Sequence, residues 1–437
     1  MAGSARYVKA DRSQLSWDMV DLDGLLPADH PARLVWAFTD SLDLSAFYDA
    51  IKAREGEPGR PPADPQVLVA LWLYATLEGV GSARALERLV KRDVSYRWLA
   101  GGVPVNYHGL SDFRVQWSEQ VDDLLKQSVT ALVSEGLVDL EEIAIDGTKI
   151  GAAVSARSYT RGGRLDQLEQ QAAERIAALK QELHDDPNAS ARRRRAAQAR
   201  AARETQEKVA KARAALEQLH REREARQKTH PKEEQKKKPP AVSLSDVEAR
   251  WMRFPDKATR PGYNVQTAAV PKLGLVLTMQ TTDRRNDEGL AVPVMAEVQA
   301  RYGCAPRRLL LDAGYATRGD IAALAAPEAG PITVYMPTPT QRPPHEASAG
   351  ARRQRTYARK KEAAAVKVWR TLMQTAEARI IYASRKLIEL IHANYKNRGM
   401  GRLTVRGMEK TQGAVLWHGL ANNFMVGQRL RAAARSA

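Results

Sequence analysis

Three acidic residues occupy positions from which they could hold metal ions together. Asp146 and Asp312 each follow an apolar run that predicts a buried strand, and Glu389 lies in residues 382–396 (YASRKLIELIHANYK), whose composition predicts a helix. Neighbouring parallel strands that end in acids place two carboxylates side by side at one edge of a sheet, and a helix packed across that edge can add a third. Three carboxylates suit two divalent ions such as Mg²⁺, with Mn²⁺ as a substitute, about 4 Å apart.

A centre of this kind would support phosphoryl transfer. One ion would lower the pKa of an attacking water or 3′-hydroxyl, the other would stabilise the leaving oxygen, and no protein nucleophile is required. The alternative for Asp146 and for Asp312 is a strand-end cap, and Asp146 followed by Gly147 is common after any apolar strand. The three acids in this order are a more specific pattern, so we expect them in one metal site.

The segment that carries Glu389 also carries a polar row. Its members lie at offsets 0, 3, 7 and 14, close to one line on a 3.6-residue helix: Tyr382, Arg385, Glu389 and Lys396. The apolar residues off that line would dock the helix: Leu387, Ile388 and Ile391. A solvated face is the alternative. Our hypothesis is that Glu389 binds metal and that its neighbours hold a nucleic-acid backbone.

Charge supports a polyanionic partner. The formal net charge is +17, and from Arg342 to the end there are 20 Lys and Arg against 5 Glu and no Asp. Concentrated basicity favours nucleic acid, although a soluble basic tail would have the same composition. Cys304 is the only cysteine, which excludes a disulfide framework and a multi-cysteine zinc site. Without an apolar signal segment or membrane span, we expect a cytoplasmic, nucleoid-associated protein.

Residues 1–137 are predicted to form a helical N-terminal domain for DNA binding or dimerisation. Asp64 before Pro65 reads as an N-cap, and Ser111 as the N-cap of a long helix. Short helices joined by Gly-rich corners are compatible with a helix-turn-helix-like DNA reader, and packing alone would give the same pattern. His108, with no second ligand nearby in sequence, is predicted to be structural or to contact a nucleic-acid backbone.

The remainder predicts a split α/β domain. Residues 138–163 give its first strand, with a tight bend at Gly147, and residues 241–437 give a strand hairpin, helix, strand, helix and strand, ending in basic helices. This order is expected of a ribonuclease-H-like catalytic domain. Residues 164–240 repeat Leu and Ala at heptad-like spacing around DDPNAS, which predicts an inserted antiparallel helical hairpin and a basic linker. The hairpin could contact DNA or a second protomer, or simply be solvated.

Several motifs resemble one family. Tyr-x2-Arg-x3-Glu-x6-Lys in residues 382–396 resembles the signature of bacterial insertion-sequence transposases of the DDE (Asp-Asp-Glu) type, and IAIDGTKI and LLLDAGYAT are similar to that family's segments at both aspartates. SDVEARWMRFPDKATRPGYNVQ resembles a family stretch that often has Pro at the position of Val247. GRPPADPQVLVALWLYATLEGVGSARALERL and NYHGLSDFR resemble the family's helical N-terminal domain. The resemblance covers most of the chain outside the hairpin.

The resemblance implies an enzyme that cuts double-stranded DNA at terminal inverted repeats and joins the ends to target DNA, without a covalent protein–DNA intermediate. It assigns backbone contacts to Tyr382, Arg385 and Lys396, and it implies a homodimer on paired ends. Arg398, Arg402 and Arg406 are further candidate phosphate contacts, each worth about one unit of salt dependence. The cysteine-rich segment of many relatives is missing from this chain. The alternative function is a catalytically silent DNA-binding relative, such as a repressor or a domesticated transposase.

Overall fold

The computed structural model describes residues 21–53, 61–185, 189–229, 239–315, 317–326, 330–338 and 362–436. Most of the predicted basic linker, residues 230–238, lies outside these ranges. Within the described part of the chain, no helix is both long and apolar enough to cross a membrane.

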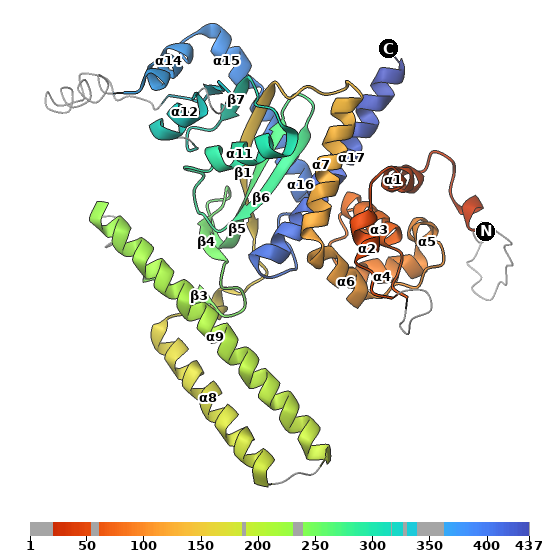
Figure 1. Ribbon diagram of the computed structural model, residues 1–437, viewed down its shortest axis with the longest axis vertical. Coiled ribbons are helices and arrows are strands. Elements are labelled where there is room, and N and C mark those ends of the chain that lie inside the picture. The colour runs from red at the N-terminus through yellow and green to blue at the C-terminus, as the bar shows by residue number, and fades with distance from the viewer. Residues whose placement is uncertain are drawn as a thin grey trace, which may run out of the picture.

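The N-terminal region is helical, as the sequence predicts (Figure 1). After a single 3₁₀ turn at Asp23–Leu25 come α1 (Pro31–Asp40), α2 (Ser45–Asp49), α3 (Pro65–Leu77), α4 (Ala83–Arg92), α5 (Val94–Ala100), α6 (Tyr107–Gln116) and α7 (Ser118–Ser134). The side chain of Asp64 caps α3 by accepting a hydrogen bond from the Gln66 amide at 2.9 Å. Nearly every residue of α3 is buried, so this helix is the centre around which the others pack.

The predicted N-cap at Ser111 is wrong. Ser111 lies inside α6, which begins after Asn106, whose side chain caps the Gly109 amide at 2.9 Å. The chain then breaks at Trp117 before α7 starts. The sequence has no Gly or Pro near Trp117, so its helix-forming residues predict one continuous helix across this position. Tertiary packing divides the segment into α6 and α7 instead.

A mixed six-stranded sheet follows. Its strands are β1 (Glu142–Gly151), β4 (Arg250–Arg253), β5 (Thr259–Val270), β6 (Leu275–Thr282), β7 (Arg308–Leu311) and β8 (Thr333–Tyr335). The order is β4-β5-β1-β7-β8, with β6 also paired to β5; β1 runs antiparallel to β5 and parallel to β7, and β7 runs parallel to β8. As predicted, β5 and β6 form a hairpin, and Gly274 in its turn has a φ of 70°.

Two apolar cores lie on the two faces of this sheet. On one face, α11 (Ala291–Tyr302), α12 (Arg318–Leu324) and α14 (Ala364–Leu372) pack on alternate residues of the strands, Ile143 and Ile145 among them. On the other, Ala144 and Ile150 share a core with α3 and with the helices that follow the sheet. Strand residues alternate between faces, so Asp146 belongs to the second face.

The C-terminal helices are α15 (Ala376–Ala383), α16 (Lys386–Asn397) and α17 (Met408–Ser436). The sequence predicts one helix over residues 382–396, and this is wrong in one respect: the helix is interrupted at Ser384 and Arg385. The hydroxyl of Ser384 donates a hydrogen bond to the Glu142 carboxylate on β1 at 2.9 Å. This contact fixes the junction between α15 and α16 to the strand that carries Asp146.

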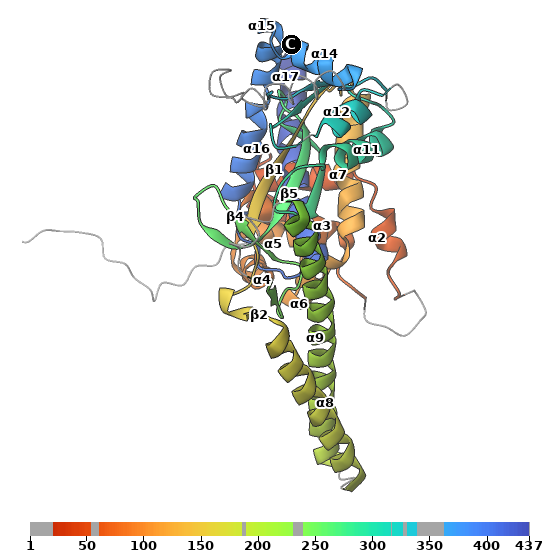
Figure 2. The same cartoon turned by 90° about the vertical axis from the view of Figure 1, so that its left-hand side faces the viewer.

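Two long helices, α8 (Gly162–Asp185) and α9 (Ala189–Thr229), pack along each other and project from the body of the molecule (Figures 1 and 2). A 3₁₀ turn at Ala156–Ser158 leads into β2 (Tyr159–Thr160), which pairs with β3 (Val242–Ser243) at the base of the projection. The two helices have a small core of their own, formed by Leu165, Val209, Ala212, Leu216 and Leu219 with Val242.

Candidate active site

Asp146 and Asp312 lie side by side. Strands β1 and β7 are parallel neighbours in which Ile145 pairs with Leu311, so the next residue of each is one of the two acids. The two aspartates therefore lie side by side, directly after paired positions of parallel strands, as the sequence predicts. The predicted end of the first strand is wrong, because β1 does not end at Asp146 but continues to Gly151, paired with β5.

Gly147 therefore makes no tight bend. It is a regular strand residue paired with Gln266, and its φ is not positive. What requires glycine is the space beside it. A Cβ at this position would stand 2.7 Å from the Gln266 Nε2 atom and would overlap the carboxylate of Asp287.

Arg385 brings the three acids together. Its guanidinium lies 3.3 Å from an Asp146 oxygen, 3.8 Å from an Asp312 oxygen and 3.5 Å from a Glu389 oxygen. The Arg385 side chain is only 12% exposed, whereas those of Asp312 and Glu389 are 53% and 61% exposed. The site is thus a partly open cluster of three carboxylates around the largely buried guanidinium of Arg385. Strands β1 and β7 supply the two aspartates, and α16 supplies Glu389.

Asp146 is the buried member of the cluster, with its side chain 14% exposed. Burial raises the pKa of Asp146 to about 6, and the Arg385 guanidinium opposes that rise. Desolvation disfavours the charged carboxylate because little water remains to solvate it. Asp146 is accordingly the acid that gains most from a nearby positive charge.

Of the other members of the predicted row, Tyr382 contacts this cluster through Arg385, and Lys396 is exposed further along α16. The Nε of Arg385 donates a hydrogen bond to the Tyr382 hydroxyl at 3.2 Å, across the break between α15 and α16. Burial lowers the pKa of Lys396, while the charge of Asp146 acts in the opposite direction, which places that ammonium within electrostatic range of the acid. Arg385 and, through it, Tyr382 therefore contact the cluster even though their helix is interrupted.

The remaining predicted cations lie apart from the acids, on the loop between α16 and α17. Arg398 ends α16, Arg402 forms a backbone bridge with Gly151, and the Nε of Arg406 donates to the Ala153 carbonyl at 2.9 Å. This loop runs past the far end of β1. Among the described residues, its cations form no ion pair with the three acids, whose cationic partner is Arg385. They are exposed or half-exposed, as a backbone contact would require.

His392, which the sequence did not predict as a site residue, also lies beside Asp146. This side chain is buried, and its Nδ1 lies 3.8 Å from an Asp146 oxygen. Burial, with Lys396 and Arg385 acting in the same direction, lowers the pKa of His392 to about 3, so the ring is neutral at ordinary pH. Its spacing of three residues from Glu389, on the same side of the helix, is the one signal in the sequence that could have identified it.

The donor chemistry of the cluster fits divalent cations, because all three groups are carboxylates. As they stand, no three carboxylate, imidazole or thiol groups of the described residues approach closely enough to enclose an ion. Instead, the guanidinium of Arg385 supplies the positive charge at the point where the acids meet. The residues fit a metal site provided that the exposed side chains of Asp312 and Glu389 turn toward Asp146.

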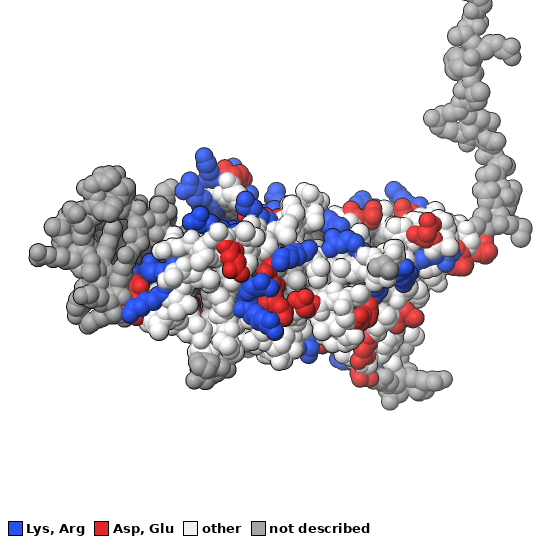
Figure 3. Space-filling view, turned by 90° about the horizontal axis from the view of Figure 1, so that it is seen from above, with Lys and Arg blue, Asp and Glu red and all other residues white. Residues whose placement is uncertain are grey.

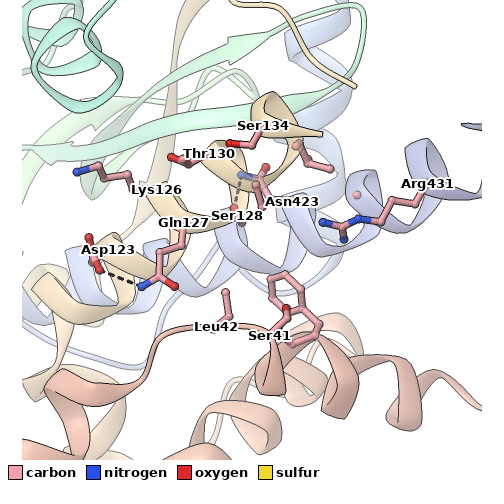
Figure 4. A pocket seen from close by; sticks show the side chains of 14 residues that line it. Ser41, Leu42, Asp123, Lys126, Gln127, Ser128, Thr130, Ser134, Asn423 and Arg431 are labelled. Atoms are coloured by element: carbon pink, nitrogen blue, oxygen red, sulfur yellow. Dashed lines mark hydrogen bonds between the residues drawn. The ribbon is translucent and has the colours of Figure 1, made fainter. Parts of the chain in front are cut away.

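The described residues also form a cleft away from the acid cluster. This cleft of about 380 Å³ between α1, α7 and α17 is lined by side chains such as Asp123, Gln127, Asn423 and Arg431 (Figure 4). Its polar groups bond to one another, as Gln127 does to Asp123 at 3.0 Å. On the face seen from above, basic and acidic side chains are intermixed among the residues drawn in colour (Figure 3).

Two protein families match separate segments of the chain. A family described as a transposase domain (DUF772) matches residues 20–116, and the transposase DDE domain family matches residues 227–424. Searches of curated proteins and of solved structures give no match. The second match includes Asp312, Glu389 and the row around them. The chain belongs to the DDE transposases of insertion sequences, and it is a DNA transposase.

Proposed function

We propose that the protein cleaves DNA at the terminal inverted repeats of its insertion sequence and joins the ends to target DNA. The observation that carries this proposal is the meeting of Asp146, Asp312 and Glu389 around one guanidinium, from two neighbouring strands and a helix. In this assignment the three acids would hold two divalent ions, Mg²⁺ or Mn²⁺, which when bound would activate the attacking hydroxyl and stabilise the leaving oxygen.

The strand order supports a ribonuclease-H-like assignment for the catalytic domain. The order β6-β5-β1-β7-β8, with the first two strands antiparallel to their neighbours and the last three parallel, sets the acids at the centre of the sheet. Helices α8 and α9 then stand as an insertion between β2 and β3. We keep residues 1–137, 138–163, 164–240 and 241–437 as the proposed division of the chain.

The chain's own residues would bind and orient the DNA. Tyr382 is hydrogen-bonded to Arg385 and Lys396 is exposed on the helix that carries Glu389, so they could hold the phosphate that is cut and its neighbour. Arg385 is buried among the carboxylates and would neutralise them while no other cation is present. Arg398, Arg402 and Arg406 continue the basic surface along the loop after α16 and would bind the backbone further from the cut.

Two further parts of the proposal follow from the activity. Joining two ends requires that both be held at once, so we propose that the protein works as a homodimer on paired ends. Its substrate also locates it with the cytoplasmic nucleoid of its host.

The test is a cleavage assay with the protein and the inverted repeats that flank its gene, with Mg²⁺ or Mn²⁺. Wild-type protein is expected to cut these repeats and not a scrambled duplex. Glu389→Gln is expected to bind the same DNA equally well but to cut it at least a hundredfold more slowly, because one carboxylate is lost. Glu409→Gln changes an exposed glutamate outside the cluster and is the matched control. Equal binding with no cleavage by either wild type or Glu389→Gln would instead identify a silent relative.

A further inference from the structure

A fourth carboxylate lies behind the acid cluster and takes no part in it. Asp287 is in the loop between β6 and α11, and its Oδ1 atom accepts two hydrogen bonds. One comes from the Asn264 amide at 2.7 Å and the other from the Gln266 amide at 2.8 Å. Both donors are buried on β5, two residues apart, and therefore on the same face of the strand.

This carboxylate touches the segment that carries the first acid. Gln266 pairs with Gly147, the residue after Asp146, and the missing Cβ of Gly147 leaves the space that Asp287 and Gln266 fill. Because successive strand residues point to opposite faces, Asp287 lies against one face of β1 while Asp146 points from the other. Asp287 and Gln266 therefore pack against the face of β1 opposite the Asp146 side chain.

The same network reaches the segment that carries the second acid. The hydroxyl of Tyr315 donates to the Oε1 atom of Gln266, and Tyr315 is completely buried. Its amide donates to the Asp312 carbonyl at 3.1 Å, and its carbonyl accepts from the Gly289 amide at 2.9 Å. A continuous chain of hydrogen bonds therefore joins Asp287, through Gln266 and Tyr315, to the turn that begins at Asp312.

We propose that Asp287 is a positioning residue that sets the separation of Asp146 and Asp312. An ionised carboxylate accepts hydrogen bonds about twice as strongly as a neutral group, and one oxygen here orders both amides of β5. Gln266, with its amide held, presents its carbonyl oxygen to Tyr315 in one orientation only. Without Asp287, both amides would lose this acceptor, and only the pairing of β1 with β7 would still join the two acid-bearing segments.

The consequence concerns metal ions, and it rests on the proposed function. Groups that orient metal ligands without touching the ion commonly affect metal affinity or activity by about 10- to 100-fold. Asp287 would act in this way through the backbone of β1 and the turn after β7, since its bonds are made on the opposite face from Asp146.

The experiment compares Asp287→Ala, Asp287→Asn and, as the matched control, Glu288→Ala, the exposed acid next to it. Hydrogen exchange of the metal-free protein measures the order of residues 143–150 and 309–315. Calorimetric titration with Mn²⁺ alone measures metal affinity, and a gel assay without metal measures binding of end DNA. The first measurement does not depend on catalysis, so it separates this inference from the proposed function.

We expect Asp287→Ala to lose exchange protection in both segments and to bind Mn²⁺ about tenfold more weakly, with DNA binding unchanged. Asp287→Asn keeps an acceptor oxygen and should recover most of the protection and affinity, and Glu288→Ala should match wild type. Unchanged exchange in both segments of Asp287→Ala would overturn the proposal. So would a loss of Mn²⁺ binding in Asp287→Asn with protection intact, since that result would make the carboxylate itself a ligand.

Tyr315→Phe tests the same network if Asp287→Ala does not fold. It removes one hydroxyl and breaks the bond to Gln266 while the ring still fills its place. Protection is then expected to fall at residues 309–315 but not at residues 143–150, with weaker Mn²⁺ binding. Wild-type exchange and affinity in this variant would contradict the proposed link.

Discussion

At the scale of single residues, Arg385 is the group on which the acid cluster depends. Its guanidinium is within 3.8 Å of all three carboxylates and is itself largely buried. Three acids so close together would otherwise repel one another, and Asp146 would be driven further toward its protonated form. The arginine therefore performs a task in the metal-free protein that cations would share when present.

Replacing Arg385 tests whether its charge stabilises the acid cluster. We expect Arg385→Gln to lower the free energy of unfolding by about 1–3 kcal/mol in a chelating buffer, because Asp146 then stays buried without a neighbouring positive charge. Added Mg²⁺ should restore more stability to the variant than to wild type, since divalent ions can neutralise the same carboxylates. Denaturant unfolding with chelator and with Mg²⁺ measures both effects. An equal Mg²⁺ response in the two proteins would contradict this reading of the cluster.

The neighbouring positions of Asp146 and Asp312 could be predicted from sequence because each follows a strongly apolar run that forms a strand, whereas Glu389 is proposed from its place in a polar row on a helix. The reason for Gly147 could not be predicted, since it is the approach of Asp287 from 140 positions further along the chain. Asp287 itself stands in a polar loop, TTDRRNDEG, that has no periodic pattern. The only trace of it was a pair of carboxamides, Asn264 and Gln266, alternating within an otherwise apolar strand.

Among the elements, β1 is unusually constrained. It is paired on both edges, and its two faces are covered by different helices. The position of a buried strand can be predicted from its apolar residues, whereas its length depends on the strands with which it pairs. Hence β1 could be located from sequence, but its continuation past Asp146 depends on β5, more than 100 residues later.

Gly147→Ala measures how closely β1 is packed. The added methyl group would displace the Asp287 and Gln266 side chains, and we expect a loss of about 1–3 kcal/mol in the free energy of unfolding. In a protein that already carries Asp287→Ala, the same change should cost less, because one of the two obstacles is gone. Gly163→Ala, where a methyl group meets nothing within 4 Å, is the control. Strict additivity of the two changes would count against direct contact.

Helix α17 carries a buried histidine that should make the fold sensitive to acid. Burial, with Arg398 and Arg114 acting in the same direction, lowers the pKa of His418 to about 3. Because the unfolded residue takes up a proton near pH 6.5, stability should fall as the pH decreases from 6.5 toward 3, by about 2 kcal/mol at pH 5.

His418→Phe removes this titration while keeping a ring beside Tyr395. The loss of unfolding free energy between pH 7.5 and pH 5 should be about 2 kcal/mol smaller in the variant than in wild type. His392 contributes in both proteins and cancels in the comparison. His108→Phe, at an exposed position, should leave the loss as it is in wild type. The same pH dependence in His418→Phe and wild type would show that this histidine does not titrate on unfolding.

At the scale of the whole molecule, the N-terminal helices and the sheet share one apolar core. Phe38 of α1 lies 5.3 Å from Phe424 of α17, ring centre to ring centre, and Phe113 of α6 lies 6.4 Å from Trp417. Helix α17 also packs against α7 and β6. The sequence predicts both regions correctly as helical and α/β, but which aromatic side chains join them depends on tertiary packing that no local pattern records.

The projecting pair α8 and α9 is different, since its core is its own and its ends meet at the β2–β3 pairing. Replacing residues 161–241 by a two-residue turn should therefore leave a folded body, with a melting temperature within a few degrees of wild type. Differential scanning calorimetry is the measurement. A variant shortened only in the outer half of both helices keeps the core at the base and serves as the control. Failure of the full deletion alone would mean that the base supports the sheet.

The length of α9 has a practical consequence. Its 41 residues span about 60 Å, but α9 runs past the base, so the reach of the pair is set by α8, whose 24 residues place Asp185 about 36 Å from β2. A fluorophore attached there would be remote from the acid cluster. It could report when two molecules come together on one DNA, and the timing of that encounter could be followed without disturbing the chemistry.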